Sequence, residues 1–314
     1  MIGDPISKSL TRPARLLFVH AHPDDETLTT GLTMASYARH HEVHLLTCTL
    51  GEEGEVIPAA LAHLAADHDD ALGLWRRQEL RAAMSVLGVA HSVLGEDLHQ
   101  GVVSRYRDSG MAGTASAERP DAFANADHDE AVAMVTAHIR AVRPDVVVTY
   151  DEQGGYGHPD HIQTHRLTMS ALRSLAAETE AGGVAVPVAF CILTAASWAS
   201  QDRLWLRDNV VSDSPHRVVM PPDAPYPPSV VPDKAVTHVV KEPTLVETQS
   251  RALAHYASQV IVYRGYYTLS NHIAARLSGR EGFAQFDPVT GLLVPATPGV
   301  SPSNGLLDQY QDHR

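Results

Sequence analysis

The sequence has few cysteines and few lysines. Its two cysteines, Cys48 and Cys191, are far apart, and each lies in an apolar run, LLTCTL and AFCIL. This arrangement excludes a disulfide framework and a CxxC metal site, and it is typical of buried strand residues in a reducing compartment. Lysine occurs three times, and 24 basic residues stand against 37 acidic ones, for a formal net charge of -13. Such a charge argues against nucleic acids and anionic membranes as partners.

Long apolar runs and several common enzyme motifs are also absent. No run approaches the length that spans a membrane, and residues 1–15 have no apolar signal-peptide region, so we expect a cytoplasmic protein. The sequence contains neither a GxSxG nucleophile motif nor a GxxxxGK phosphate loop. Acidic residues, instead of GxGxxG, follow the first predicted strand and would repel a pyrophosphate, so we expect no bound dinucleotide.

Short apolar segments alternate with helical patterns through the first half of the chain. Residues 15–19, 43–50 and 145–150 are rich in β-forming residues and predict buried strands. Between them, a helix with an apolar face over residues 80–87 can end at Gly88. This alternation predicts an α/β, Rossmann-like fold with a mainly parallel sheet and helices on both faces.

The alternation weakens after about residue 190. Residues 220–232 read MPPDAPYPPSVVP and are too rich in proline for a regular element. A helix is expected near residues 245–260, and the composition of the C-terminal tail predicts a loosely ordered segment. We therefore expect a Rossmann-like, metal-binding catalytic domain over residues 1–190 and a smaller C-terminal cap over residues 191–314.

The first predicted strand leads directly into a polar cluster. Residues 19–28 read VHAHPDDETL and bring two histidines and three carboxylates together. Crowding these groups is costly unless a cation or a proton-transfer task holds them together. His22 and Asp25 are three positions apart across a strand-to-helix turn, which is a suitable spacing for two ligands of one metal ion.

A second polar cluster follows the strand at residues 145–150. Its sequence, YDEQGGYGHPDHIQTH, contains His158, Asp160 and His161, and the proline between them suits the start of a helix. Ligands of doubly wound sheets bind beyond the carboxyl ends of the strands, so the two clusters should share one edge of the sheet. His165 is a rival metal ligand, but a histidine on the helix face is the simpler interpretation.

His22, Asp25 and His161 make a set of two histidines and one carboxylate with an open coordination position. This set is typical of catalytic zinc sites, and it also suits Fe(II). Asp24 would then act as a general base toward water. His158 would donate a proton or stabilise an oxyanion.

Asp160 would fix the tautomer of His158 and raise its pKa.

Helix capping by Asp24 or Asp25 is the simpler alternative for the first cluster. Capping alone does not account for two such clusters at two strand ends.

These residues resemble the motifs of the LmbE-like (PIG-L) family of metal-dependent N-acetylglucosaminyl deacetylases. The two family motifs stand here as AHPDDE at residues 21–26 and GHPDH at residues 157–161. Residues 47–57, 105–114 and 146–161 further resemble the members that act in mycothiol biosynthesis. Those members remove acetate from 1-D-myo-inositol 2-acetamido-2-deoxy-alpha-D-glucopyranoside. The resemblance covers residues 15–170 well and the remainder loosely.

The resemblance implies a role for each matching residue, with one Zn²⁺ per chain and Fe²⁺ as a possible substitute. The implied metal ligands are His22, Asp25 and His161, the general base is Asp24, and the acid is His158. Tyr156 would help to polarise the amide carbonyl, and Arg76 and Asp108 would hold hydroxyl groups of a small amino-sugar substrate. For Arg76 the simpler alternative is a solvated arginine on a polar helix face.

Two other functions remain open. Mycothiol S-conjugate amidase shares the same metal set and cleaves a neighbouring amide. A non-catalytic module that binds a glycan or another partner would not need Asp24, Tyr156 and His158. The segment LAHYASQVIV and residues 220–232 depart from the family pattern, which leaves the substrate less certain than the reaction.

Overall fold

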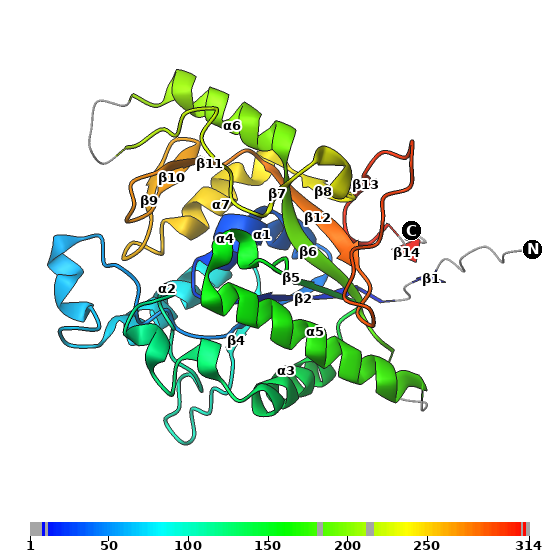
Figure 1. Ribbon diagram of the computed structural model, residues 1–314, viewed down its shortest axis with the longest axis horizontal. Helices are drawn as coiled ribbons and strands as arrows, with labels where there is room; N and C mark the ends of the chain where they lie inside the picture. Colours follow the sequence, from blue (N-terminus) through cyan, green and yellow to red (C-terminus); the bar gives the residue numbers. More distant parts are fainter. Residues whose placement is uncertain (1–7, 10–11, 181–184, 212–216, 309, 312–314) are drawn as a thin grey trace, which may run out of the picture.

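The computed structural model describes residues 8–9, 12–180, 185–211, 217–308 and 310–311. Its main sheet is made from strands of both halves of the chain (Figure 1). These strands are β2 (Arg15–His20), β3 (Glu42–Thr47), β4 (Ala90–Val93), β5 (Val146–Thr149), β6 (Val188–Ala195), β7 (Val230–Val231), β8 (His238–Lys241), β12 (Arg280–Phe286) and β13 (Ser303–Asn304).

The order of the main sheet places its switch point between β2 and β5. The strands run in the order β13-β8-β12-β6-β5-β2-β3-β4, and β7 pairs with β6. From β6 to β4 all neighbours are parallel, whereas β12 is antiparallel to both β6 and β8. Because β3 and β5 lie on opposite sides of β2, the loops after β2 and β5 flank the crevice where doubly wound folds bind ligands.

Helices cover both faces of this sheet. They are α1 (Asp25–Tyr37), α2 (Leu72–Leu87), α3 (His128–Val142), α4 (Gly154–Gly157), α5 (Pro159–Glu180), α6 (Ala196–Asn209) and α7 (Val246–Leu253). Short 3-10 helices span Ala59–Leu64, Ser116–Glu118, Phe123–Asn125, Asp233–Ala235 and Pro243–Leu245. In Figure 1, α3 and α5 lie together below the sheet.

Alternate residues of the central strands supply the two halves of the core. Leu16 and Phe18 of β2 pack with residues of α1, α2 and α7. Leu17 and Val19 pack with residues of α3 and α5 on the opposite face. Successive strand side chains point to opposite faces, so a strand buried on both sides reads as a continuous apolar run. The predicted α/β fold with helices on both faces is confirmed.

Most predicted elements of the first half are present, with shifted ends. Gly88 closes α2 with φ 74°, a left-handed conformation that glycine adopts readily. Pro159 begins α5, as its position before an apolar helical pattern predicts. The helix expected near residues 245–260 is shorter, because α7 ends at Leu253.

The last third of the chain does more than cover the sheet. A small antiparallel sheet of β9 (Ile261–Tyr263), β10 (Tyr266–Thr268) and β11 (Ala274–Arg276) forms a separate layer with α6. However, β8, β12 and β13 extend the main sheet itself. The division into a catalytic domain and a cap at residue 190 therefore stays a prediction. The main sheet continues past this boundary, because β8, β12 and β13 belong to it.

The tail predicted to be loosely ordered contains strand pairing. β13 pairs with β8, and β14 (Tyr310–Gln311) pairs with β1 (Lys8–Ser9). Residues 309 and 312–314 lie outside the described residues. Within the described ranges, no helix combines the length and apolar character needed to cross a membrane.

Candidate active site

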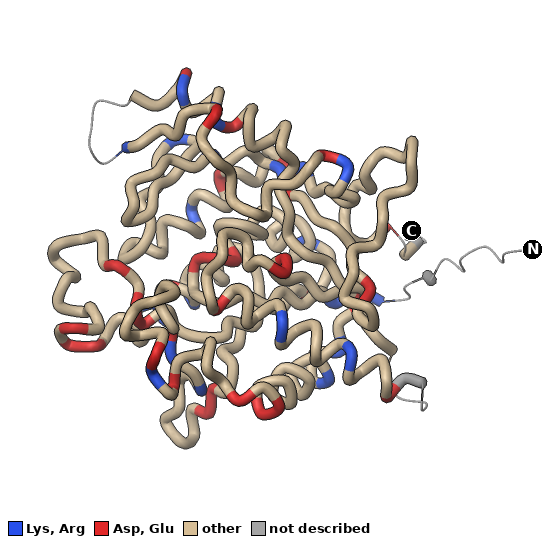
Figure 2. The backbone as a smooth tube through the Cα atoms, viewed as in Figure 1, with Lys and Arg blue, Asp and Glu red and all other residues tan. Residues whose placement is uncertain are grey.

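The two predicted clusters meet above the carboxyl ends of β2 and β5. His22 and Asp25 lie at the turn from β2 into α1, while His158 and His161 lie where α4 leads into α5. All four side chains are buried. Figure 2 shows acidic residues close together at the middle of the molecule, where Figure 1 labels α4.

Three potential ligand atoms form a nearly equilateral triangle. Nδ1 of His22 and Nε2 of His161 each lie 3.1 Å from Oδ2 of Asp25. The two nitrogens are 3.3 Å apart. In a tetrahedral zinc site with bonds of about 2.0–2.1 Å, ligand atoms are about 3.3–3.4 Å apart. The triangle therefore fits a small divalent ion, with one position left open.

Two other groups of ligand atoms share His22 with this triangle. Ring nitrogens of His22, His158 and His161 lie within 4.8 Å of one another, and so do ligand atoms of His22, Asp108 and Asp160. In the triangle that contains Asp25, all three interatomic distances are 3.1–3.3 Å, close to those of a tetrahedral zinc site. This triangle is therefore the better candidate for the metal ligands.

In each ligand histidine, the ring nitrogen that points away from the triangle lies within hydrogen-bond distance of an oxygen. Nε2 of His22 lies 3.1 Å from Oδ2 of Asp160, and Nδ1 of His161 lies 3.1 Å from the carbonyl of Gly154. Donation of these outer N–H groups leaves the inner nitrogens with lone pairs toward the triangle. The carbonyl of Gly154 can approach His161 because glycine has no Cβ. A Cβ at this position would lie 2.7 Å from Cβ of His161.

Asp160 contacts a different histidine from the one predicted. Its Oδ2 accepts from the backbone N–H of Ser109 at 2.9 Å and faces His22, not His158. Only the backbone N–H of Asp160 reaches His158, donating to Nδ1 at 3.2 Å. The carboxylate of Asp160 therefore faces His22, because the first turn of α5 directs it toward the loop after β2, and Asp160 acts on the tautomer of His158 through its backbone N–H.

His158 is neutral in this environment. Burial is the main cause that lowers its pKa, His22 and His161 add to this effect, and the net pKa is about 3. Because Nδ1 accepts the N–H of Asp160, the proton of the neutral ring is on Nε2. His158 can therefore donate a hydrogen bond from Nε2, whereas a resident imidazolium is disfavoured.

Tyr150 is a site residue that the sequence patterns did not single out. Its hydroxyl donates to Oδ2 of Asp25 at 2.8 Å and accepts from the N–H of Ala21 at 3.0 Å. Its ring stacks on His161 with centroids 4.3 Å apart. Tyr150 thus contacts two of the three proposed ligands. Its place at the end of β5, beside the second cluster, was the available signal.

Asp24 is held at the entrance of α1 in an unusual backbone conformation. Its φ is 110°, and its side chain makes no capping hydrogen bond, which argues against simple helix capping. Oδ2 of Asp24 lies 3.0 Å from Nη2 of Arg76. Burial raises the pKa of Asp24 to about 8, although Arg76 opposes this shift and Asp25 adds to it.

Arg76 is neither a solvated helix-face residue nor free to bind substrate through all of its donors. It is buried on α2, with 3% of its surface exposed. Besides Asp24, its guanidinium donates to the carbonyl of Gly51 at 2.8 Å and to the carbonyl of Pro23. Arg76 therefore orients Asp24 and joins the loops after β2 and β3.

Asp108 and Tyr156 contact different histidines of the site. Oδ1 of Asp108 is 3.4 Å from Nε2 of His22 and accepts from the N–H of Gly110 at 2.8 Å. Burial raises the pKa of Asp108, but His22 and these hydrogen bonds outweigh it, so the net pKa is lowered. Tyr156 places its ring edge against His161, with centroids 5.1 Å apart, and is 55% exposed.

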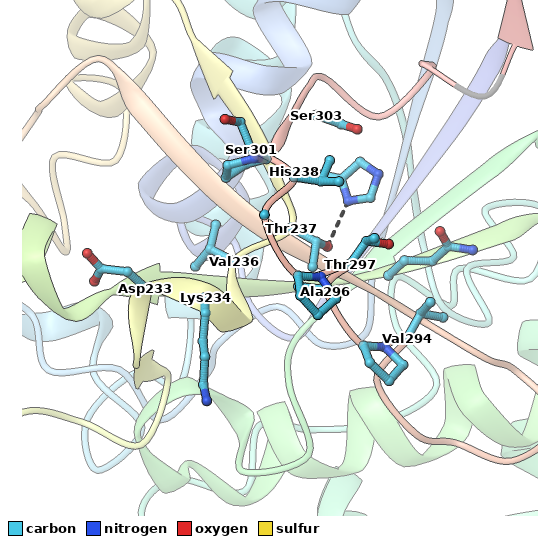
Figure 3. Close-up of a pocket in the computed structure, with 16 residues that line it drawn as sticks. Asp233, Lys234, Val236, Thr237, His238, Val294, Ala296, Thr297, Ser301 and Ser303 are labelled. Carbon is cyan, nitrogen blue, oxygen red and sulfur yellow. Dashed lines mark hydrogen bonds between the residues drawn. The ribbon is translucent and has the colours of Figure 1, made fainter.

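Two other features lie outside this cluster. Nδ1 of His165 is 2.8 Å from the carbonyl of Tyr150, so this histidine supports the end of β5 instead of joining the ligand triangle. A cavity of about 780 Å³ lies at the β8 end of the main sheet (Figure 3). His238 and Lys234 line it, but it includes none of the proposed catalytic or metal-binding residues.

Comparison with known proteins identifies the family. Residues 17–172 match the model of PIG-L, GlcNAc-PI de-N-acetylase. The chain belongs to this family. The expectation drawn from AHPDDE and GHPDH is confirmed, and this PIG-L member has both motifs within the matched region.

Curated relatives match over most of the chain. A protein of Geodermatophilus obscurus is 45% identical over 87% of this chain and 92% of its own length. A protein of Thermobispora bispora is 44% identical over 93% of this chain and 94% of its own. Both are named 1D-myo-inositol 2-acetamido-2-deoxy-alpha-D-glucopyranoside deacetylase.

A solved structure supports the fold alone. GalB, the 4-carboxy-2-hydroxymuconate hydratase of Pseudomonas putida KT2440, superimposes with a TM-score of 0.50 at 18% identity. The match covers 78% of this chain and 80% of that chain. Because fold does not determine reaction, function must be argued from the site and from the relatives with higher identity.

Proposed function

We propose that this PIG-L member hydrolyses the acetamide of 1-D-myo-inositol 2-acetamido-2-deoxy-alpha-D-glucopyranoside, releasing acetate and the free amino sugar in mycothiol biosynthesis. The observation that carries the reaction is the triangle of His22 Nδ1, Asp25 Oδ2 and His161 Nε2, with edges of 3.1–3.3 Å. The substrate follows from relatives of that name at 44–45% identity. The buried carboxylate of Asp24 beside the triangle adds a proton acceptor.

His22, Asp25 and His161 would hold one Zn²⁺ per chain, and the same ligands also suit Fe²⁺. When bound, the ion would supply Lewis acidity and lower the pKa of water. Metal binding requires neutral imidazoles and an ionised carboxylate. The outer partners Asp160 and Gly154 orient the two rings accordingly, which supports this assignment.

Asp24 accepts the proton of the water that attacks the acetamide carbonyl carbon. Burial raises the pKa of Asp24, so once its carboxylate has taken up the proton of the water, the carboxyl can hold that proton and return it to the departing amine as the C–N bond breaks. Arg76 holds one oxygen of Asp24, which fixes the carboxylate during both transfers. The expected acid, His158, instead donates a hydrogen bond from Nε2 to the developing oxyanion.

Tyr156 and Asp108 would both contact the substrate. The exposed ring of Tyr156 places its hydroxyl where a carbonyl oxygen could accept a hydrogen bond. Asp108 keeps an ionised carboxylate beside the histidines, where sugar hydroxyls can donate to it. Arg76 acts through Asp24 in this proposal, so its direct role toward substrate is replaced by a positioning one.

The deciding experiment is amine release by metal-loaded protein from N-acetylglucosaminyl-inositol and from a mycothiol S-conjugate, under identical conditions. Faster release from the former supports the deacetylase. Faster release from the conjugate would support the same reaction at the same site, with the protein acting as a mycothiol S-conjugate amidase. Metal binding without amine release from either substrate would favour a non-catalytic binding module.

We also propose that the protein acts in the cytoplasm. Cys48 and Cys191 are both free and buried, and burial raises the pKa of each thiol to about 12. Such unpaired thiols are compatible with a reducing compartment, where they stay protonated and inert.

A further inference from the structure

The proline-dense segment at residues 220–232 ends beside the loop that carries Tyr156. The backbone N–H of Ser229 donates to the carbonyl of Gly155 at 3.0 Å, and the carbonyl of Ser229 accepts from the N–H of Thr194 at 2.9 Å. The carbonyl of Gly155 belongs to the peptide group that leads into Tyr156. Ser229 therefore ties the end of β6 to the backbone that carries this side chain.

The ring of Tyr156 contacts the rings of His158 and His161. Its ring is 55% exposed, and its hydroxyl has no hydrogen-bond partner within the part of the chain that the structure describes. The two preceding residues, Gly154 and Gly155, have φ of 62° and 76°. Glycines allow many backbone conformations, so the position of the ring depends on what holds the peptide group before it.

The proline segment needs donors from elsewhere to hold Ser229 in place. Six of its residues lack a backbone N–H, and they are Pro221, Pro222, Pro225, Pro227, Pro228 and Pro232. Arg203 on α6 supplies donors to four carbonyls, at Pro221 (3.3 Å), Pro222 (3.4 Å), Pro225 (2.8 Å) and Ala224. Its guanidinium also lies 3.6 Å from the ring centroid of Tyr226.

The segment then turns directly into Ser229. The N–H of Val230 donates to the carbonyl of Pro227 at 3.0 Å, which closes a β-turn with Pro228 in its second position. Val230 and Val231 go on to pair with the end of β6. The turn thus leaves the N–H of Ser229 available for Gly155.

We propose that Arg203 is a positioning residue of the deacetylation reaction, acting through the proline segment and Ser229 to hold Tyr156 over the metal site. This inference rests on the proposed function for its kinetic consequence, but the physical link does not depend on the substrate. A planar guanidinium with five donors can gather several carbonyls at once, whereas a lysine ammonium cannot reproduce that geometry.

The first test measures hydrogen exchange of the metal-loaded protein in the peptide that covers residues 150–158. Arg203→Ala should accelerate exchange there by roughly 5- to 10-fold, since about one net hydrogen bond of local stability is lost. Arg203→Lys should also accelerate it. Arg207→Ala is the matched control, because Arg207 lies on the same helix and pairs with Asp208 at 2.9 Å. Exchange equal to that of wild type in Arg203→Ala would overturn the link.

The second test asks whether the kinetic effect passes through Tyr156. Arg203→Ala should lower kcat by roughly 10- to 100-fold with a nearly unchanged KM and metal content, as expected for a displaced catalytic group. In a Tyr156→Phe background the same substitution should have little further effect, because coupled residues are not additive. An equal loss in both backgrounds would mean a general structural role and would refute the proposal.

A third variant keeps the test decisive if Arg203→Ala folds poorly. Ser229→Pro removes the N–H that reaches Gly155 and changes none of the residues whose carbonyls Arg203 contacts, and Ser229→Ala keeps that N–H. We expect Ser229→Pro to match Arg203→Ala in exchange and kcat, and Ser229→Ala to match wild type. If the wild type releases no amine, the proposed function fails, while the exchange comparison still decides the role of Arg203.

Discussion

The hydroxyl of Tyr150 lies 2.8 Å from Oδ2 of Asp25, the same oxygen that faces the ring nitrogens of His22 and His161. A neutral donor at this position orients the carboxylate without competing for the ion. Partners that orient metal ligands in this way are worth about 10- to 100-fold in metal affinity.

Tyr150→Phe should therefore bind zinc roughly 10- to 100-fold more weakly, because Asp25 loses its orienting hydrogen bond. Competition with a chromophoric chelator measures this affinity. Tyr263→Phe is a suitable control, since its ring stacks on Tyr266 and packs with residues of α6. Equal affinities of Tyr150→Phe and wild type would remove Tyr150 from the site.

His22→Ala should lose tight metal binding altogether, because it removes one corner of the ligand triangle. Metal content after dialysis, measured by elemental analysis, gives the result. Removing the ion from wild type with a chelator should also lower the Tm, since a ligand that binds only the folded state stabilises it. A His22→Ala protein that keeps one tightly bound ion would contradict the ligand assignment.

Asp24→Asn should keep the metal and slow turnover by roughly 10²- to 10⁴-fold, the usual range for loss of a general base. The amide preserves the size of the side chain and leaves an oxygen for Arg76. Steady-state amine release, normalised to metal content, measures the effect. Asp67→Asn is a useful control, because that side chain is 82% exposed. Turnover near that of wild type would exclude Asp24 as the base.

Gly154→Ala should destabilise the fold by about 2–5 kcal/mol. A left-handed backbone costs about 1–2 kcal/mol and overpacking about 1–3 kcal/mol. Both apply at Gly154, where φ is 62° and a Cβ would lie 2.7 Å from the backbone nitrogen of Ile162. Gly88→Ala should cost less, because its φ is 74° but its nearest neighbour would be 3.6 Å away. Denaturant unfolding compares the two, and equal losses would argue against the steric contribution.

Acid should destabilise the protein partly through His138. Burial lowers the pKa of His138 below 6.5, and its Nε2 is buried without a hydrogen-bond partner among the described residues. A lowered histidine pKa stabilises the fold above the unfolded pKa, and this contribution is lost as pH falls through 6.5 toward the folded value. The unfolding free energy of His138→Gln should therefore decrease less than that of wild type between pH 7.5 and pH 5.5.

The exposed His99 provides the comparison for this pH effect. His99→Gln should follow the pH dependence of wild type. Denaturant titrations at several pH values give the free energies. If His138→Gln and His99→Gln respond identically to acid, burial of His138 does not contribute to acid sensitivity.

The sequence predicts the metal ligands and the central strands because their signals are local. His22 and Asp25 follow β2 within five positions, and a strand buried on both faces is a recognisable apolar run. Parallel strand order then brings the loop after β2 next to the loop after β5. The triangle of ligand atoms follows from these two facts.

Other features depend on pairing and contacts between distant segments. β12 inserts between β6 and β8, although residues after 190 were predicted to form only a cap. The contact of Asp160 with His22 depends on the direction of the first turn of α5, which spacing alone does not give. Likewise, no periodic pattern indicates that Arg76 reaches the carbonyl of Gly51.

The ligand triangle joins residues near position 22 to a residue at position 161, across the central strand pair β2 and β5. During synthesis, the ribosome must therefore release more than half of the chain before all three ligands exist outside the exit tunnel. Ion capture then has to wait for β5 to dock beside β2. Under the proposed ligand assignment, metal binding is accordingly a late event that follows completion of the central sheet, and shorter nascent chains would bind zinc poorly.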